Sequence, residues 1–140
     1  LAMKGHLTIA INDEIVRDID NLVVNSGKNY VASRMAGNSP NVMSHMAIGA
    51  NNDAAAATQS ALGDEKAIVA LTGGGGSASG ANVTYTATFA ANTPSSAAAI
   101  KEAGIFNGAS SGTMLCRTVF DVVNKQPSDS MTITWVVTAS

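Results

Sequence analysis

Residues 98–138 read AAIKEAGIFNGASSGTMLCRTVFDVVNKQPSDSMTITWVVT and contain three apolar-alternating runs, at 99–106, 113–121 and 131–138. In the third run apolar residues alternate with threonines, so that the two sets of side chains point to opposite sides of an extended chain. This period of two is expected of a strand with one buried face. Turn-forming residues separate the runs. The stretch therefore predicts an antiparallel meander that carries the only tryptophan, Trp135.

The same alternation occurs earlier in the chain. It is clearest at 82–89, where Val, Tyr, Ala and Phe alternate with Asn and Thr. Shorter extended runs are predicted at 7–11, 42–48 and 66–71. Short strands joined by turns at intervals of about 8 to 15 residues are typical of an antiparallel β-sandwich. We expect a mainly β protein with a single domain over residues 1–140.

One segment has helical spacing instead. Asn12 is a favourable N-cap residue, and Asp13 and Glu14 follow it in the first turn, where acidic side chains favour the positive end of the helix dipole. Apolar residues then recur at helical intervals, and Ser26-Gly27 supplies a C-terminal stop. The apolar positions are Ile15, Val16, Ile19, Leu22 and Val23. The pattern predicts one N-terminal amphipathic helix, residues 13–25, that covers the sheet.

Residues 73–80 consist of Gly, Ser and Ala alone. Such a segment has no large side chains to hold one geometry, so we expect a flexible hairpin connection. A phosphate-binding loop is the alternative, but it requires a lysine and a strand-to-helix context that this segment lacks.

Charge is sparse and unevenly distributed. The chain has 8 basic and 10 acidic residues and a formal net charge of −2. No Lys/Arg cluster predicts a nucleic-acid partner, and no run approaches the roughly 20 apolar residues of a membrane span. Residues 1–66 hold 12 of the 18 charges, and residues 67–140 hold the other six. The charge-poor part is either a surface that meets other protein or a solvated Ser/Thr face.

The sequence predicts no catalytic residue, no cofactor and no metal site, and hence no enzyme. His6 and His45 lack the spacing of metal ligands, and no serine lies in a nucleophile elbow. Cys116 cannot form an internal disulfide, and we interpret it as a small buried apolar residue.

Glu102 and Arg117 are the one pair of opposite charges inside apolar strands. If residues 107–112 close a simple hairpin with Phe106 opposite Thr113, Glu102 falls opposite Arg117 on the same face. We expect this pair to be structural.

Five further segments occur in a fixed order along the chain: HMAIGA at 45–50, TQSALGDE at 58–65, IKEAGIFN at 100–107, GTMLCRTVF at 112–120 and MTITW at 131–135. This order resembles small structural proteins of tailed bacteriophages. In that family an "HIAIGTG…TALG" half precedes an "EAGLFN…GTMLARTVF…LTITW" half. The chain departs from the family at Ala50-Asn51-Asn52, where Thr-Gly-Thr is commoner, and in its longer Gly-rich loop.

The resemblance implies a capsid decoration (cement) protein on the outer surface of the virion. Such a protein binds the major capsid protein across neighbouring subunits and is implied to be a homotrimer. A tail-fibre or baseplate attachment module is an alternative within virions. A host-surface carbohydrate-binding or adhesion domain is an alternative of another class, and it would require exposed aromatic residues.

Overall fold

The computed structural model describes residues 2–38 and 40–139 and is mainly β. The described chain contains one α-helix, α1 (Asn25–Met35), and one short 3₁₀ turn, η1 (Thr72–Gly74). The expectation of a single domain over residues 1–140 stays a prediction. The strands are β1 (Met3–Ile11), β2 (Glu14–Val23), β3 (His45–Gly49), β4 (Glu65–Ala70), β5 (Ser77–Ser79), β6 (Asn82–Phe89), β7 (Ala98–Phe106), β8 (Met114–Lys125) and β9 (Met131–Ala139).

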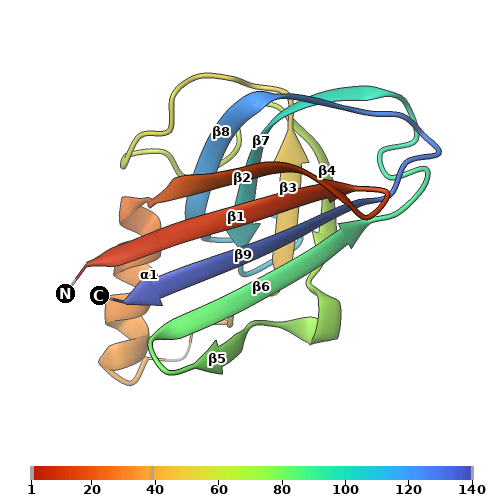
Figure 1. Cartoon of the computed structure of the whole chain (residues 1–140). Coiled ribbons are helices and arrows are strands. Elements are labelled where there is room, and N and C mark those ends of the chain that lie inside the picture. Colours follow the sequence, from red (N-terminus) through yellow and green to blue (C-terminus); the bar gives the residue numbers. More distant parts are fainter. Residues whose placement is uncertain (1, 39, 140) are drawn as a thin grey trace.

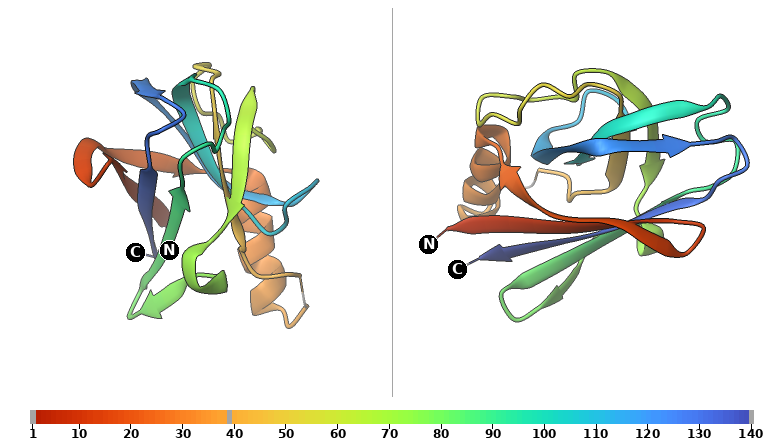
Figure 2. Two further views of the ribbon diagram at one scale, coloured as in Figure 1. Left: turned by 90° about the vertical axis from the view of Figure 1, so that its right-hand side faces the viewer. Right: turned by 45° about the horizontal axis from the view of Figure 1, so that its top comes forward.

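These strands form one antiparallel sheet rather than two separate sheets. Within the described residues the order is β4-β3-β7-β8-β2-β1-β9-β6-β5. We call β2, β1, β9, β6 and β5 the front half, and β8, β7, β3 and β4 the back half. The halves are joined where Leu22 pairs with Arg117 and Val23 with Cys116. The sheet curls so that its halves face each other, which gives a half-open barrel in place of the predicted sandwich (Figures 1 and 2).

The core fills the space between the two halves. On β9 the alternation is as predicted, with Met131, Ile133, Trp135 and Val137 buried and the residues between them half-buried on the outer side. The indole nitrogen of Trp135 donates to Oδ1 of Asn21 at 2.9 Å, so its N–H is satisfied inside the core. The back half contributes Met46, Ile48, Ile100, Ile105 and Leu115 to the same core.

The predicted meander is wrong in its last step. β7 and β8 form the expected hairpin, but β9 does not pair with β8. Instead the chain crosses to the front half, where β9 lies between β1 and β6 and pairs with both along its length. Pairing on two sides completes the backbone hydrogen bonds of β9, whereas a position beside β8 would leave the edges of β1 and β6 open.

The predicted helix at residues 13–25 is also wrong, because residues 14–23 form β2 and pair with β1. Asn12 and Asp13 are the two central residues of the β1–β2 turn, with φ of 48° and 69°. Positive φ at both positions is the geometry of a type I′ hairpin turn. Asn and Asp tolerate this left-handed region and also favour helix N-caps, so the same two residues suited either structure.

A bulge in this hairpin changes the direction of one side chain. The register passes from Ile9↔Arg17 to Ala10↔Ile15, so Val16 is the extra residue. A bulge exchanges the faces of the residues beyond it. Ile15 consequently shares the outer side with Ala10, and 66% of it is exposed.

The helix lies further along the chain than predicted. Ser26 and Gly27, interpreted as a stop signal, lie inside the first turn of α1. The Ser26 hydroxyl donates to the carbonyl of Met114 at 2.7 Å. Gly27 is buried so closely on β8 that a Cβ there would overlap the Leu115 carbonyl. The absent side chain thus lets the start of α1 rest directly on β8 (Figure 1).

The Gly/Ser segment has regular elements at both ends. η1 begins it, and β5 then pairs with β6 in register Ser77↔Thr84 and Ser79↔Asn82. The prediction of a hairpin connection is wrong, because the strands before and after the segment, β4 and β6, lie in different halves of the sheet and do not pair. Residues 77–79 instead belong to the sheet, and Gly80, at positive φ, lies in the β5–β6 turn.

The turn geometry predicts the effect of changes at Asp13. Asp13→Gly is expected to raise the free energy of unfolding by up to about 1 kcal/mol, and Asp13→Val to lower it by about 1–2 kcal/mol, since β-branched residues resist positive φ. Urea denaturation with an unchanged m-value is the measurement. Glu14→Val, at the adjacent extended position, is the control and is expected to have a small effect. Equal stability of Asp13→Val and the wild type would contradict this turn.

Candidate functional site

Glu102 and Arg117 form a buried ion pair. Their exposed fractions are 0% and 1%, and Oε1 of Glu102 lies 3.1 Å from both Nε and Nη2 of Arg117. The pair is diagonal, because Arg117 lies opposite Gly104 and Glu102 opposite Val119. The expected register was wrong, since Phe106 faces Met114 rather than Thr113 and the hairpin has two irregularities. Diagonal neighbours share a face, and side chains of this length reach across.

The loop of residues 50–64 closes over Arg117. Nη1 donates to the Asp53 carbonyl at 2.9 Å and to Oε1 of Gln59 at 3.0 Å, and Nη2 donates to Oδ1 of Asn51 at 3.2 Å. One guanidinium therefore holds two strands and three points of this loop together. A buried charge of this kind is tolerated only when its donors find partners.

Glu102 receives matching backbone donors from the same loop. Its Oε1 accepts from the N–H of Gly63 at 2.8 Å, and its Oε2 accepts from the N–H groups of Asn51 at 3.0 Å and Asp64 at 2.8 Å. Within the described residues no buried side-chain N or O atom lacks a hydrogen-bond partner. The arrangement is a closed structural network, and all of its polar atoms are occupied.

The close approach of the loop requires small residues beside the pair. Gly49 pairs with Glu102 across β3 and β7, and a Cβ on it would overlap the Asp64 carbonyl and the Glu102 carboxylate. A Cβ on Gly63 would likewise overlap the Asn51 side chain. These overlaps explain glycines at both ends of the loop. Sequence reasoning missed Asn51 and Gln59 as partners of Arg117, and the flanking glycines were the available signal.

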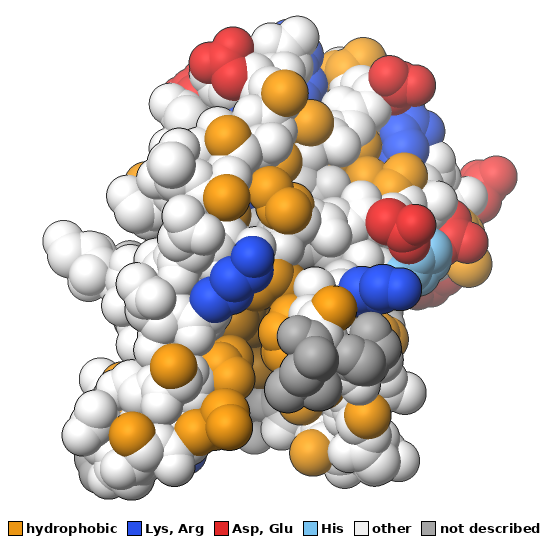
Figure 3. All heavy atoms as spheres, turned by 90° about the vertical axis from the view of Figure 1, so that its left-hand side faces the viewer, with side chains coloured by type: hydrophobic (Ala, Val, Ile, Leu, Met, Phe, Trp, Pro, Cys, Tyr) orange, Lys and Arg blue, Asp and Glu red, His pale blue; other side chains and the backbone are white. Residues whose placement is uncertain are grey.

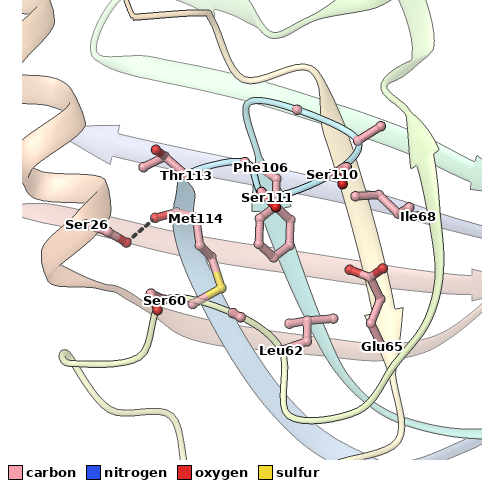
Figure 4. A pocket seen from close by; sticks show the side chains of 14 residues that line it. Ser26, Ser60, Leu62, Glu65, Ile68, Phe106, Ser110, Ser111, Thr113 and Met114 are labelled. Atoms are coloured by element: carbon pink, nitrogen blue, oxygen red, sulfur yellow. Dashed lines mark hydrogen bonds between the residues drawn. The ribbon is translucent and has the colours of Figure 1, made fainter.

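A groove of about 620 Å³ lies next to this loop (Figure 4). Leu62, Ile68, Phe106 and Met114 give it apolar walls, and the Ser-rich turn of residues 108–113 forms one side. The Glu65 carboxylate points into it (Figure 4). Burial, and next the nearby charge of Glu102, raise the pKa of Glu65. Among the described residues that line it, the groove has one acidic group, Glu65, beside apolar side chains, and no histidine or cysteine.

The outer side of the front half is a wide uncharged surface. Neighbouring rows across β1, β9 and β6 are Thr8–Thr134–Thr86 and Ala10–Thr132–Thr88. Thr88 and Thr132 lie with their hydroxyl oxygens 3.1 Å apart. We call these positions, together with Thr84 and Val136, the threonine face. Charge on this side lies at its border, on β2 and the start of β1.

His6 lies at that border between two aspartates of β2. Its Nδ1 is 2.7 Å from Oδ1 of Asp20, and its Nε2 contacts Asp18. Sequence reasoning missed this cluster because residues 14–23 were assigned to a helix. His45 is elsewhere, with its Nδ1 2.8 Å from the Ser44 hydroxyl.

The structure also bears on Cys116, on metal binding and on membrane spans. Cys116 is buried, as predicted, and burial raises the pKa of its thiol. Among the described residues no group of three or more His, Cys, Asp and Glu has the geometry to hold a metal ion. No helix in the described part of the chain is long and apolar enough to cross a bilayer.

Breaking the buried pair is expected to be costly. Arg117→Met leaves the Glu102 carboxylate buried without its cation and should lower the free energy of unfolding by about 3–5 kcal/mol. The double variant with Glu102→Met should lose less than the sum of the single variants, with a coupling of about 1–3 kcal/mol. Urea denaturation measures stability. Faster limited proteolysis within residues 50–64 would report that the loop is no longer held by Arg117. Strictly additive losses would contradict the pair as the anchor.

The His6 cluster predicts a pH-dependent stability. Hydrogen bonds to Asp20 and then Asp18 raise the pKa of His6 above its ordinary value of 6.5. Protonated His6 is favoured in the folded state, so its contribution is fully present below pH 6.5 and is lost as pH rises through the folded pKa. The effect is small because the site is exposed. NMR titration of the His6 ring is the measurement. Asp20→Asn should move its pKa towards 6.5, and an unchanged pKa would contradict the assignment.

Comparison of the chain with protein-family models, with curated proteins and with solved structures found no match.

Proposed function

We propose that this protein is a phage capsid decoration (cement) protein that binds the major capsid protein across neighbouring subunits and stabilises the shell. The observation that carries the proposal is the threonine face, an uncharged surface three strands wide on the outer side of the sheet. The resemblance of the sequence to small virion proteins supports the same role. We infer that the charge-poor second half of the chain supplies a contact surface.

The distribution of charge supports this inference. Of the six charged residues in 67–140, Glu102, Arg117 and Lys125 are buried. The Lys125 ammonium donates to the Ala90 carbonyl at 3.2 Å, and burial lowers its pKa. Surface charge normally opposes association between protein molecules. Few charged side chains of this region therefore remain at the surface to oppose docking.

A cement role requires modest contacts at many equivalent sites. Each threonine buried in a contact contributes a methyl group and a hydroxyl that needs a partner, so a single contact is weak. Symmetry repeats the contact over the shell, and a subunit that bridges neighbours gains from simultaneous engagement. This role needs shape and repetition more than an enclosed binding site.

The other classes have less support in the structure. Tyr85, Phe89, Phe106 and Trp135 are buried, and Tyr30 and Phe120 are half-buried, so a sugar would find no fully exposed ring on which to stack. A tail-fibre or baseplate module is compatible with the same surfaces and differs from cement mainly in copy number.

Quantitative mass spectrometry of purified virions of the phage that encodes the chain tests the proposal. Hundreds of copies per particle are expected for cement, whereas a few tens or fewer would place the protein in the tail. Absence from the virion would refute both.

The threonine face predicts which substitutions prevent incorporation. Thr86→Lys with Thr134→Lys should lower occupancy on particles about tenfold or more, since the contact would bury unpaired charges. Thr58→Lys, on the exposed loop of residues 50–64, is the matched control and should leave occupancy unchanged. Thermal unfolding of each variant separates lost docking from lost folding. Normal occupancy of the double variant would exclude this face.

A further inference from the structure

A second surface lies at the end of the molecule where β1 begins and β9 ends, between α1 and the sheet (Figure 3). Two adjoining hollows of about 460 and 270 Å³ share Met3, Val31 and Met35. Tyr30, Tyr85 and Val137 extend the lining of the smaller hollow. We call the two hollows together the α1 groove. Its lining is largely apolar, and 76% of Met35 is exposed there.

The groove exists because only the start of α1 rests on the sheet. Gly27 and Ser26 hold that first turn against β8. In the later turns Val31 packs partly against the core and lines both hollows, whereas most of the Met35 side chain stays exposed. An exposed apolar groove of this kind marks a contact surface.

The charges around the groove are basic. Lys28 lines the larger hollow and Arg34 the smaller one, and none of the described residues that line either hollow is acidic. The Arg34 guanidinium donates to the Pro40 carbonyl at 3.0 Å, which fixes it beside the groove. In a chain with net charge −2, this local excess favours an acidic apolar partner. A concave groove also suits an inserted protein segment better than a flat bilayer.

The opposite end of β1 carries a segment of the required chemistry. The hairpin tip presents Asp13, Glu14 and Ile15, all exposed. The bulge at Val16 turns Ile15 outward, so a large apolar side chain stands beside two carboxylates. Asp129 adds a third carboxylate at this end, since its Oδ1 accepts from the Asn12 amide at 3.0 Å. We call residues 13–15 the acidic tip.

We propose that the acidic tip of one copy of this chain docks in the α1 groove of a second copy. Ile15 enters the hollow beside Met35, and Asp13 and Glu14 face Lys28 and Arg34. The two surfaces lie at opposite ends of β1, a separation of about 27 Å along the strand, so one molecule cannot satisfy both by itself. The contact is head-to-tail, so a docked pair keeps one free groove on the first copy and one free tip on the second. Such contacts build rings or filaments rather than closed two-fold dimers.

This contact does not depend on the capsid role, because it uses neither the threonine face nor a viral partner. The bulge is its strongest support. A regular hairpin would turn Ile15 towards the core, whereas the bulge exposes it next to two acids. The matching groove has the opposite charge and the same apolar character.

Sedimentation velocity of the isolated chain from about 1 to 200 µM tests the proposal. The wild type should associate with increasing concentration. Met35→Glu and Ile15→Lys should each weaken association at least tenfold. Val122→Glu and Val122→Lys are the matched controls, since Val122 is 42% exposed on β8 outside both surfaces, and they should associate like the wild type. Circular dichroism and thermal unfolding confirm that each variant is folded.

Mixing the two variants gives the sharper test. The Ile15→Lys chain keeps an intact groove and the Met35→Glu chain keeps an intact tip, so an equimolar mixture should form a 1:1 dimer and nothing larger. A wild type that stays monomeric overturns the proposal. Undiminished association of either variant, loss of association in the controls, or no dimer in the mixture overturns it equally.

Discussion

The position of Arg117 sets the constraint on which the rest of the structure depends. Its backbone pairs with Leu22 at the short junction where the two halves of the sheet meet. Its side chain meets Glu102 and binds the loop of residues 50–64. A buried charge needs every donor occupied, so the closed loop stabilises the junction. One residue thereby couples the curl of the sheet to the conformation of the loop.

The junction also separates the surfaces of the molecule. Beyond Leu22 and Val23, β2 and β8 diverge, and the Arg17 guanidinium donates to the carbonyls of Asp121 and Val122 across the gap. The front half then presents the threonine face, while the back half holds the loop and the groove beside Glu65. The two halves share one core but meet solvent with different chemistry.

The strands with clear period-two alternation were predictable from the sequence, and the structure confirms β6, β7 and β9 close to the expected positions. β2 was not predictable from pattern alone, because its bulge breaks the strand period and leaves Ile15, Val16 and Ile19 at helical spacing. The order of the strands in the sheet was also not predictable from the sequence, because pairing between β1 and β9 depends on contacts between distant parts of the chain. Local pattern specifies strands, and long-range packing selects their neighbours.

The candidate surfaces were also predictable only in part from the sequence. The charge-poor second half was visible in the sequence, and Glu102 with Arg117 stood out as charges in apolar strands. The α1 groove was not visible, because it combines β1, α1, β6, β8 and β9. The acidic tip was hidden by its assignment to a helix.

The place of β9 in the sheet has a consequence for synthesis. Among the described strands β9 comes last in the sequence, yet it lies in the interior of the front half, between β1 and β6. While the ribosome makes the chain, β1 and β6 emerge long before the strand that joins them. The nascent chain must carry two unpaired strand edges until residues 131–139 leave the exit tunnel, a state open to pairing with other chains. Abundant production of this protein would favour chaperone cover during that interval.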